Sequence, residues 1–142
     1  MGISSLIIYL EKEIVMSESL LQKTKRMIEG LAHGKFVEGM EEFYADDVIN
    51  EEPTGATIEG KTTLIAHEKQ VLEGVAEYHG IEVKAIGTGE DDGNGNGVTF
   101  AEYKITIDLK DGGKFNPDQV QVTRWENGLA KHNKFYYDPN FQ

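Results

Sequence analysis

The stretch FYADDVINEEPTG, residues 43–55, places four carboxylates between an aromatic pair and a Pro-Thr-Gly turn. We interpret residues 48–52 as a short strand, in which period-two alternation puts Asn50 and Glu52 on one face. Pro53 cannot donate a hydrogen bond to a neighbouring strand, so pairing is expected to stop there. If the Asn50 face looks inward, Glu52 reaches a cavity; if it looks outward, the acids form a solvated loop. The sequence leaves both alternatives open.

Helical periodicity is present on both sides of this stretch. Apolar residues recur at three-to-four-residue steps, which predicts amphipathic helices. Three helices are expected, over residues 17–33, 35–44 and 60–79. Ser17 and Ser19 are alternative N-caps of the first helix.

The period changes to two after the third helix. Strands are expected over residues 81–86, 98–109, 115–125 and 129–137, where β-branched and aromatic residues alternate with polar ones. The turn sequences DDGNGNG, KDGG and ENG separate these strands and predict antiparallel hairpins. Helices followed by hairpin-linked strands are typical of an α+β domain. Polar residues on both faces of the last two strands favour a sheet that curves around a partly polar pocket.

The glycine-rich turn of residues 92–97, DGNGNG, matches the opening of a calcium-binding helix–loop–helix. The twelfth position, where a bidentate glutamate is required, is Tyr103, and strands are expected on both sides of the loop. We therefore interpret this segment as a hairpin tip. The four histidines also lack the spacing of a metal site, so neither a metal nor a cofactor is expected.

The composition narrows the class of protein. A chain of 142 residues has the usual size of one domain. Its 14 basic and 25 acidic residues give a net charge of −11, which argues against nucleic acid or an anionic membrane surface as a partner. There is no cysteine, so disulfides and thiolate chemistry are excluded.

The N-terminal segment is interpreted separately from the domain. Residues 3–10 are apolar but too few to span a bilayer, and no basic region of a signal peptide precedes them. We assign residues 1–16 to an N-terminal extension and residues 17–142 to the domain, with a start at Met16 as the alternative. A cytoplasmic protein is expected.

The order of elements, together with FYADDVINEEPTG, QVTRWENG and KFYYD, resembles the nuclear transport factor two-like superfamily. Within it, the chain is most similar to SnoaL-like and ketosteroid-isomerase-like proteins over residues 17–138. The resemblance implies three N-terminal helices packed on a strongly curved antiparallel sheet, which forms a cone-shaped α+β barrel with a pocket. This fold hosts isomerases, cyclases, hydrolases and non-catalytic binders, so it does not by itself name an activity.

The resemblance also implies site residues. Ketosteroid isomerases carry YADD-x-x-x-E-D-P-x-G, and the acid before proline, their general base, corresponds to Glu52. Their oxyanion-binding aspartate corresponds to Gln121, whose amide can also donate a hydrogen bond. Their tyrosine donor falls near Met27 or Ile28, which cannot donate, and the aspartate of SnoaL-type cyclases falls on Phe135. Ligand contacts are expected on the inner faces of the strands, from Asn50, Tyr103, Thr123, Trp125, Asn133, Phe135 and Tyr137.

Two functions remain open at this point. The first is a cofactor-independent isomerase that uses Glu52 and Gln121 to move a proton on a small apolar ligand with a carbonyl or hydroxyl group. The alternative is a non-catalytic ligand-binding or dimeric interaction module. The resemblance also implies a homodimer, formed through the outer sheet face that carries Glu102, Lys104 and Thr106.

Overall fold

The structure is a computed structural model that describes residues 2–7 and 18–141. Residues 3–7 are helical. The boundary at residue 16, the alternative start at Met16 and the candidate cap Ser17 lie outside the described residues. In the part of the chain that is described, no helix is both long and apolar enough to cross a membrane.

Three helices precede or interrupt the sheet: α2 (Leu20–Ala32), α3 (Phe36–Phe43) and α4 (Lys61–Glu73). Helix α2 starts with a capping box, in which Ser19 accepts from the backbone N–H of Gln22 and the Gln22 side chain accepts from that of Ser19. The helix ends before Gly34, whose φ of 75° is the left-handed conformation that glycine adopts readily. The predicted cap at Ser19 and the predicted end at His33-Gly34 are confirmed.

The third helix is shorter than predicted. Helix α4 ends at Glu73, and strand β3 (Val75–Asp91) already includes His79, which the sequence analysis placed at the helix end. Pairing with β4 (Gly97–Leu109) decides this, because Val75 lies opposite Leu109 and the ladder continues to the far end of both strands.

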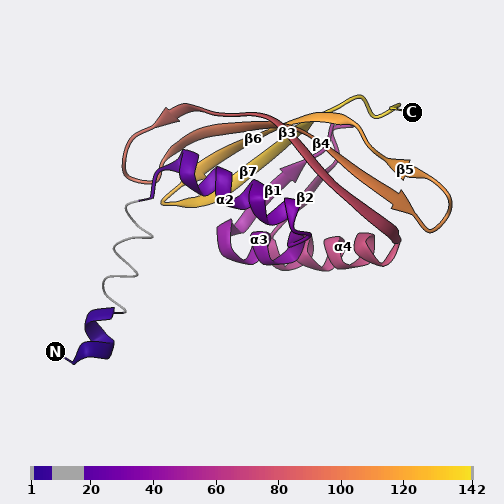
Figure 1. Ribbon diagram of the computed structural model, residues 1–142. Coiled ribbons are helices and arrows are strands. Elements are labelled where there is room, and N and C mark those ends of the chain that lie inside the picture. The colour runs from indigo at the N-terminus through magenta and orange to yellow at the C-terminus, as the bar shows by residue number, and fades with distance from the viewer. Residues whose placement is uncertain (1, 8–17, 142) are drawn as a thin grey trace.

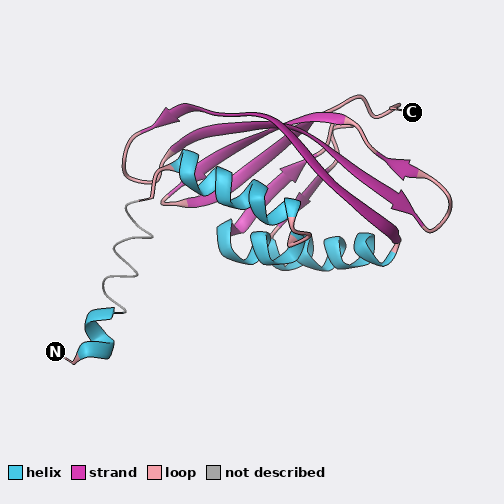
Figure 2. Ribbon diagram, viewed as in Figure 1, coloured by secondary structure: helices cyan, strands magenta, loops and turns pink. Residues whose placement is uncertain are grey.

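Strands β3 and β4 belong to a single seven-stranded sheet. The other strands of this sheet are β1 (Tyr44–Glu51), β2 (Thr57–Glu59), β5 (Lys114–Phe115), β6 (Asp118–Glu126) and β7 (Leu129–Tyr136). The order is β2-β1-β7-β6-β4-β3, with β5 added beside β4. Figure 2 shows the strands in magenta, curved over the helices in cyan. Strand β2 was not predicted, and β1 begins four residues earlier than expected. Asp46 and Asp47 therefore lie in a strand, where Asp47 forms an ion pair with Lys131.

The sheet is mixed, not purely antiparallel as predicted. Strands β3, β4, β6 and β7 are joined by antiparallel pairing, but β1 runs parallel to β7. Strand β1 follows α3 directly and is not joined to β7 by a hairpin turn. It therefore does not have to run antiparallel to β7, and it runs in the same direction. The predicted α+β class, with helices packed on a strongly curved sheet, is confirmed (Figure 1).

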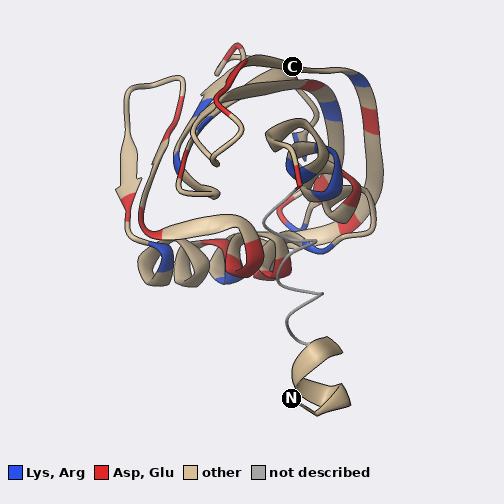
Figure 3. Ribbon diagram, turned by 90° about the vertical axis from the view of Figure 1, so that its left-hand side faces the viewer, with Lys and Arg blue, Asp and Glu red and all other residues tan. Residues whose placement is uncertain are grey.

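The concave face of the sheet carries the core. Helix α2 packs along this face with Leu20 and Ile28 buried, and α3 and α4 lie across its open side (Figure 1). A chain of hydrogen bonds fixes α2 to two strands: the indole N–H of Trp125 donates to Thr99 at 2.8 Å, and the Thr99 and Thr24 hydroxyls are 2.7 Å apart. Acidic and basic positions are spread over helices and strands alike (Figure 3).

The DGNGNG segment is a hairpin tip between β3 and β4, as predicted. The Asp92 carboxylate accepts hydrogen bonds from the backbone N–H groups of Asn94 and Asn96 within the tip. The tip then contacts the β6–β7 turn, where the Gly128 N–H donates to the Gly95 carbonyl at 2.9 Å. The tip therefore holds the β3–β4 hairpin against the β6–β7 hairpin.

Gly97 provides a test of this packing. A Cβ atom at this position would lie 2.0 Å from the carbonyl oxygen of Glu90 and 2.9 Å from a methyl group of Leu20. We expect Gly97→Ala to lower the free energy of unfolding by about 2 kcal/mol, because the backbone of β3 and helix α2 must both shift. Urea denaturation measures this.

The control is Gly89→Ala in the same hairpin, where the new Cβ would meet only ordinary contacts. Equal stability of the two variants would contradict the close packing of α2 on the start of β4.

Candidate active site

A cavity of about 620 Å³ lies between the concave face of the sheet and the helices. Most of its wall is apolar, with Phe36 and Met40 from α3, Leu64 from α4, and Ile105 from β4 among the lining residues. A few polar side chains also reach it. A concave, mostly apolar pocket with a small number of polar groups is typical of small-molecule binding sites.

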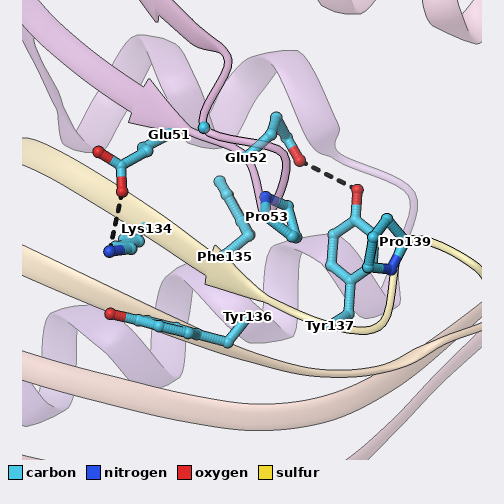
Figure 4. A pocket seen from close by; sticks show the side chains of 9 residues that line it. Glu51, Glu52, Pro53, Lys134, Phe135, Tyr136, Tyr137 and Pro139 are labelled. Carbon is cyan, nitrogen blue, oxygen red and sulfur yellow. Dashed lines mark hydrogen bonds and ion pairs between the residues drawn. The ribbon is translucent and has the colours of Figure 1, made fainter.

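The acidic stretch points one carboxylate to each side of strand β1. Glu51 forms an ion pair with Lys134 of β7 at 3.0 Å, on the outer side of the sheet. Glu52 turns the other way, and its Oε2 accepts a hydrogen bond from the Tyr137 hydroxyl at 3.0 Å (Figure 4). Glu52 lines the cavity, while Val48 and Asn50 are buried. The face of β1 that carries Asn50 and continues to Glu52 therefore looks inward, so Glu52 reaches a cavity and is not part of a solvated loop.

Tyr137 holds Glu52 in place. Burial raises the pKa of the Tyr137 phenol to about 12, and the negative charge of Glu52 and their hydrogen bond act in the same direction. The phenol is therefore protonated at neutral pH and donates to the carboxylate. With Oε2 engaged in this way, the second carboxylate oxygen of Glu52 is the one that can face a ligand.

A buried hydrogen-bond network runs across β4, β6, β7 and β1 on the sheet wall of the cavity. The Tyr103 hydroxyl donates to Gln121 Oε1 at 2.9 Å. The Gln121 amide nitrogen donates to Thr123 at 3.3 Å and to Asn133 at 3.2 Å. Asn133 in turn donates to Asn50 at 2.9 Å. Both N–H groups of Gln121 are thus used inside the protein, whereas the phenol of Tyr103 lines the cavity.

The residues predicted for the site fall into two groups. Six of them line the cavity: Asn50, Glu52, Tyr103, Gln121, Phe135 and Tyr137. Thr123 and Asn133 belong to the hydrogen-bond network behind Gln121, and Trp125 packs in the core against Phe43 with the two rings at 89°. Direct ligand contact by these last three residues stays a prediction.

Glu68 and Gln119 are among the polar cavity residues that were not selected from the sequence. Glu68 lies one helical turn after Leu64 on α4, so the inward face of the helix could have identified it. Gln119 shares the inner face of β6 with Gln121 and is only 6% exposed. Period-two alternation along β6 indicates this position as well.

Glu68 differs from the other cavity residues in its electrostatics. Burial raises the pKa of its carboxyl group, the His67 side chain opposes this shift, and the Glu52 carboxylate adds to it. Among the described residues, Glu68 forms no ion pair with a lysine or arginine. A carboxylate in an apolar wall without a cation is costly to ionise.

One cluster in the described part of the chain has metal-ligand character. His79 Nε2 lies 2.7 Å from Asp108 Oδ2 and 3.8 Å from Glu77 Oε2. These side chains belong to β3 and β4 and are not among those that line the cavity. Their hydrogen bond is sufficient to explain why the pKa of His79 is raised and that of Asp108 lowered.

The raised pKa of Glu68 predicts a dependence of stability on pH. A carboxyl whose pKa is higher in the folded than in the unfolded state binds more protons when folded, so stability falls as pH rises through this interval. We expect Glu68→Gln to be more stable than the wild type at about pH 7.5 and equal to it at about pH 4, in urea denaturation. The control is Glu73→Gln, an exposed position on the same helix; the same pH-dependent gain there would assign the effect to net charge.

No protein-family model matches this chain, and no curated protein matches it. Solved structures do match. A candidate SnoaL-like polyketide cyclase from Mesorhizobium loti is 23% identical, with a TM-score of 0.70 over 84% of this chain and 100% of that chain. An NTF-2 like protein of unknown function from Burkholderia xenovorans is 24% identical, with a TM-score of 0.63 over 85% of this chain and 84% of that one.

A third structure, from Catenulispora acidiphila, is described as a protein with a ketosteroid isomerase-like fold in complex with trimethylamine. It is 13% identical, with a TM-score of 0.63 over 80% of this chain and 85% of that chain. At these identities the similarity concerns the fold. The chain has the nuclear transport factor two-like fold, in the form shared by SnoaL-like and ketosteroid-isomerase-like proteins, as the sequence resemblance implied.

Proposed function

We propose that this protein binds a small, mostly apolar molecule with a carbonyl or hydroxyl group and transfers a proton on it without a cofactor, as an isomerase. The observation that carries the proposal is that Glu52 and the Tyr103 phenol line the same mostly apolar cavity. The Catenulispora acidiphila protein, in complex with trimethylamine, supports small-molecule binding as a use of this fold.

In the proposed reaction, the free oxygen of Glu52 removes a proton from a carbon next to the ligand carbonyl. The electron pair of that C–H bond moves into the carbonyl, which becomes an enolate, and Glu52 becomes a carboxylic acid. The ligand carries a C=C bond on the far side of that carbon, and the carboxylic acid of Glu52, whose proton exchanges with solvent, protonates the far end of the conjugated enolate. The double bond has moved, Glu52 is a carboxylate again, and no oxidant or co-reactant is consumed.

Tyr103 is a better oxyanion donor than Gln121, which the sequence analysis selected. Both amide N–H groups of Gln121 already donate to Thr123 and Asn133. The Tyr103 hydroxyl needs only to turn from Gln121 Oε1 toward a ligand oxygen, and burial raises the pKa of this phenol, so it stays protonated. In the free protein Gln121 holds the Tyr103 hydroxyl, and in the ligand complex the phenol donates to the enolate oxygen instead and stabilises it.

A matched pair of variants tests the base. We expect Glu52→Gln to bind ligand but to lose proton exchange at the reacting carbon by at least about 100-fold, because the amide cannot accept the proton. A thermal-shift screen of steroid, enone and polyketide-like compounds finds a ligand, and NMR of that ligand in D₂O measures exchange. Glu51→Gln, whose carboxylate faces Lys134 on the outer side, should exchange at the wild-type rate. Equal rates in all three proteins would remove Glu52 from the reaction.

The second candidate function is a non-catalytic binder. It is favoured by one observation: the position of the isomerase tyrosine donor is taken by Met27 and Ile28, of which Met27 lines the cavity. If ligands raise the melting temperature of the wild type and of Glu52→Gln equally, and no exchange is detected in either, the protein is a non-catalytic binder and the proposed isomerase activity is wrong.

We also propose that the protein is a homodimer through the outer face of the sheet. Phe100 and Tyr136 are 39% and 50% exposed there, on the face that also carries Glu102 and Lys104. An apolar group of this kind on a sheet face is typical of an interface. Phe100 also covers Gly87 of the neighbouring strand, so its ring is held in place on this face.

We expect light scattering after size exclusion to give twice the chain mass of 15.8 kDa. Phe100→Glu should give a monomer, because a carboxylate in a paired apolar face has no partner. Gln70→Glu, at an exposed position of α4, controls for the added charge. A wild type that elutes at the monomer mass would overturn the proposed dimer.

A further inference from the structure

We propose that the ligand of this cavity carries a cationic amine, and that Glu68 is the residue that pairs with the amine. The inference rests on the proposed use of the cavity for a small molecule, and it specifies the chemical class of that molecule.

The cavity wall carries more acidic than basic side chains. Two carboxyl side chains, Glu52 and Glu68, line the cavity, whereas no lysine or arginine of the described residues does. His67 lines it too, but its side chain is exposed to solvent. Anionic ligands such as carboxylates or phosphates would meet two like charges in a wall of low polarity, which disfavours their binding. A cation is favoured by both carboxylates and also by the net charge of −11.

Of these two carboxyls, Glu68 is the one that has no partner in the described part of the chain. Glu52 accepts a hydrogen bond from Tyr137, whereas Glu68 has neither an ion pair nor a hydrogen bond among residues 18–141. The groups that act on Glu68 electrostatically are His67 on its own helix and Glu52 just after β1, and Glu52 repels it. An ammonium group beside Glu68 would supply the missing partner and relieve this repulsion.

Gln119 gives an independent indication of a polar ligand. Its side chain is nine-tenths buried and lines the cavity, next to Tyr103, its partner in the β4–β6 ladder. The Gln119 amide forms no side-chain hydrogen bond in the described part of the chain, and its polar atoms are open to the cavity and not enclosed by protein. Buried amides are almost always hydrogen-bonded, so this group is suited to a ligand that both donates and accepts.

The aromatic side chains of the cavity wall also suit an organic cation. Aromatic rings stabilise alkylammonium groups that lie over their faces. Six of them line the cavity, from both helices and strands: Phe36, Tyr44, Tyr103, Phe115, Phe135 and Tyr137. The ligand class that fits all of these groups is an amine that also bears a carbonyl or hydroxyl group.

A pair of isosteric probes separates charge from shape. Choline and 3,3-dimethyl-1-butanol have the same outline and hydroxyl group, but only choline is cationic. We expect isothermal titration to show that the wild type binds choline at least tenfold more tightly than the neutral alcohol. In Glu68→Gln, choline should lose about tenfold in affinity, which corresponds to about 1.4 kcal/mol, while the alcohol should bind as before.

Two controls make the result specific. Glu73→Gln removes a charge from the exposed face of the same helix and should leave both affinities unchanged. Gln119→Leu should weaken both probes to a similar extent, because it removes a polar contact and not a charge.

The outcomes separate this inference from the proposed function. If the two probes bind equally, if choline does not bind, or if Glu68→Gln affects neither probe, the amine inference is wrong. Binding of compounds from the steroid, enone and polyketide-like screen would then still support the cavity as a small-molecule site. If those compounds fail as well, the proposed function is wrong too.

Discussion

Asn50 and Asn133 lie opposite each other in the parallel pair of β1 and β7, joined by a side-chain hydrogen bond of 2.9 Å. This pairing places the acidic stretch of residues 46–52, which follows helix α3, beside the last strand. It sets Glu52 beside Tyr137 and links Asn50 to Gln121 and Tyr103. A slip of one residue in this register would turn Glu52 outward and Glu51 inward.

The site combines an apolar cavity with polar groups that are satisfied to different degrees. Tyr103, Gln121 and Asn133 satisfy one another, which fixes the sheet wall and holds a phenol at the cavity surface. Glu68 and Gln119, which line the same cavity, have no such partners among residues 18–141. Because buried polar groups normally have partners, the satisfied groups define the frame of the cavity and the unsatisfied ones indicate where a ligand is to be sought.

Local periodicity predicted the elements whose limits depend on local chemistry. The capping box at Ser19 and the glycine at position 34 set the limits of α2, and the glycine-rich tip at 92–97 set the β3–β4 hairpin. The predicted end of α4 and the predicted start of β1 were wrong, because strand pairing between residues distant in sequence decides both limits. Glu68 was not selected because helix periodicity places a residue on a face but does not show that a cavity lies there.

The sequence by itself determined the α+β class, the hairpins of the long strands, and the alternation that puts Glu51 and Glu52 on opposite faces of β1. These features depend on neighbouring residues and on the geometry of single helices and strands. Only the tertiary structure decided which face of β1 looks inward, that β1 runs parallel to β7, and that Tyr103, Gln119 and Glu68 meet in one cavity. Those outcomes depend on contacts between residues far apart in the chain, for which the periodicity of one segment carries no information.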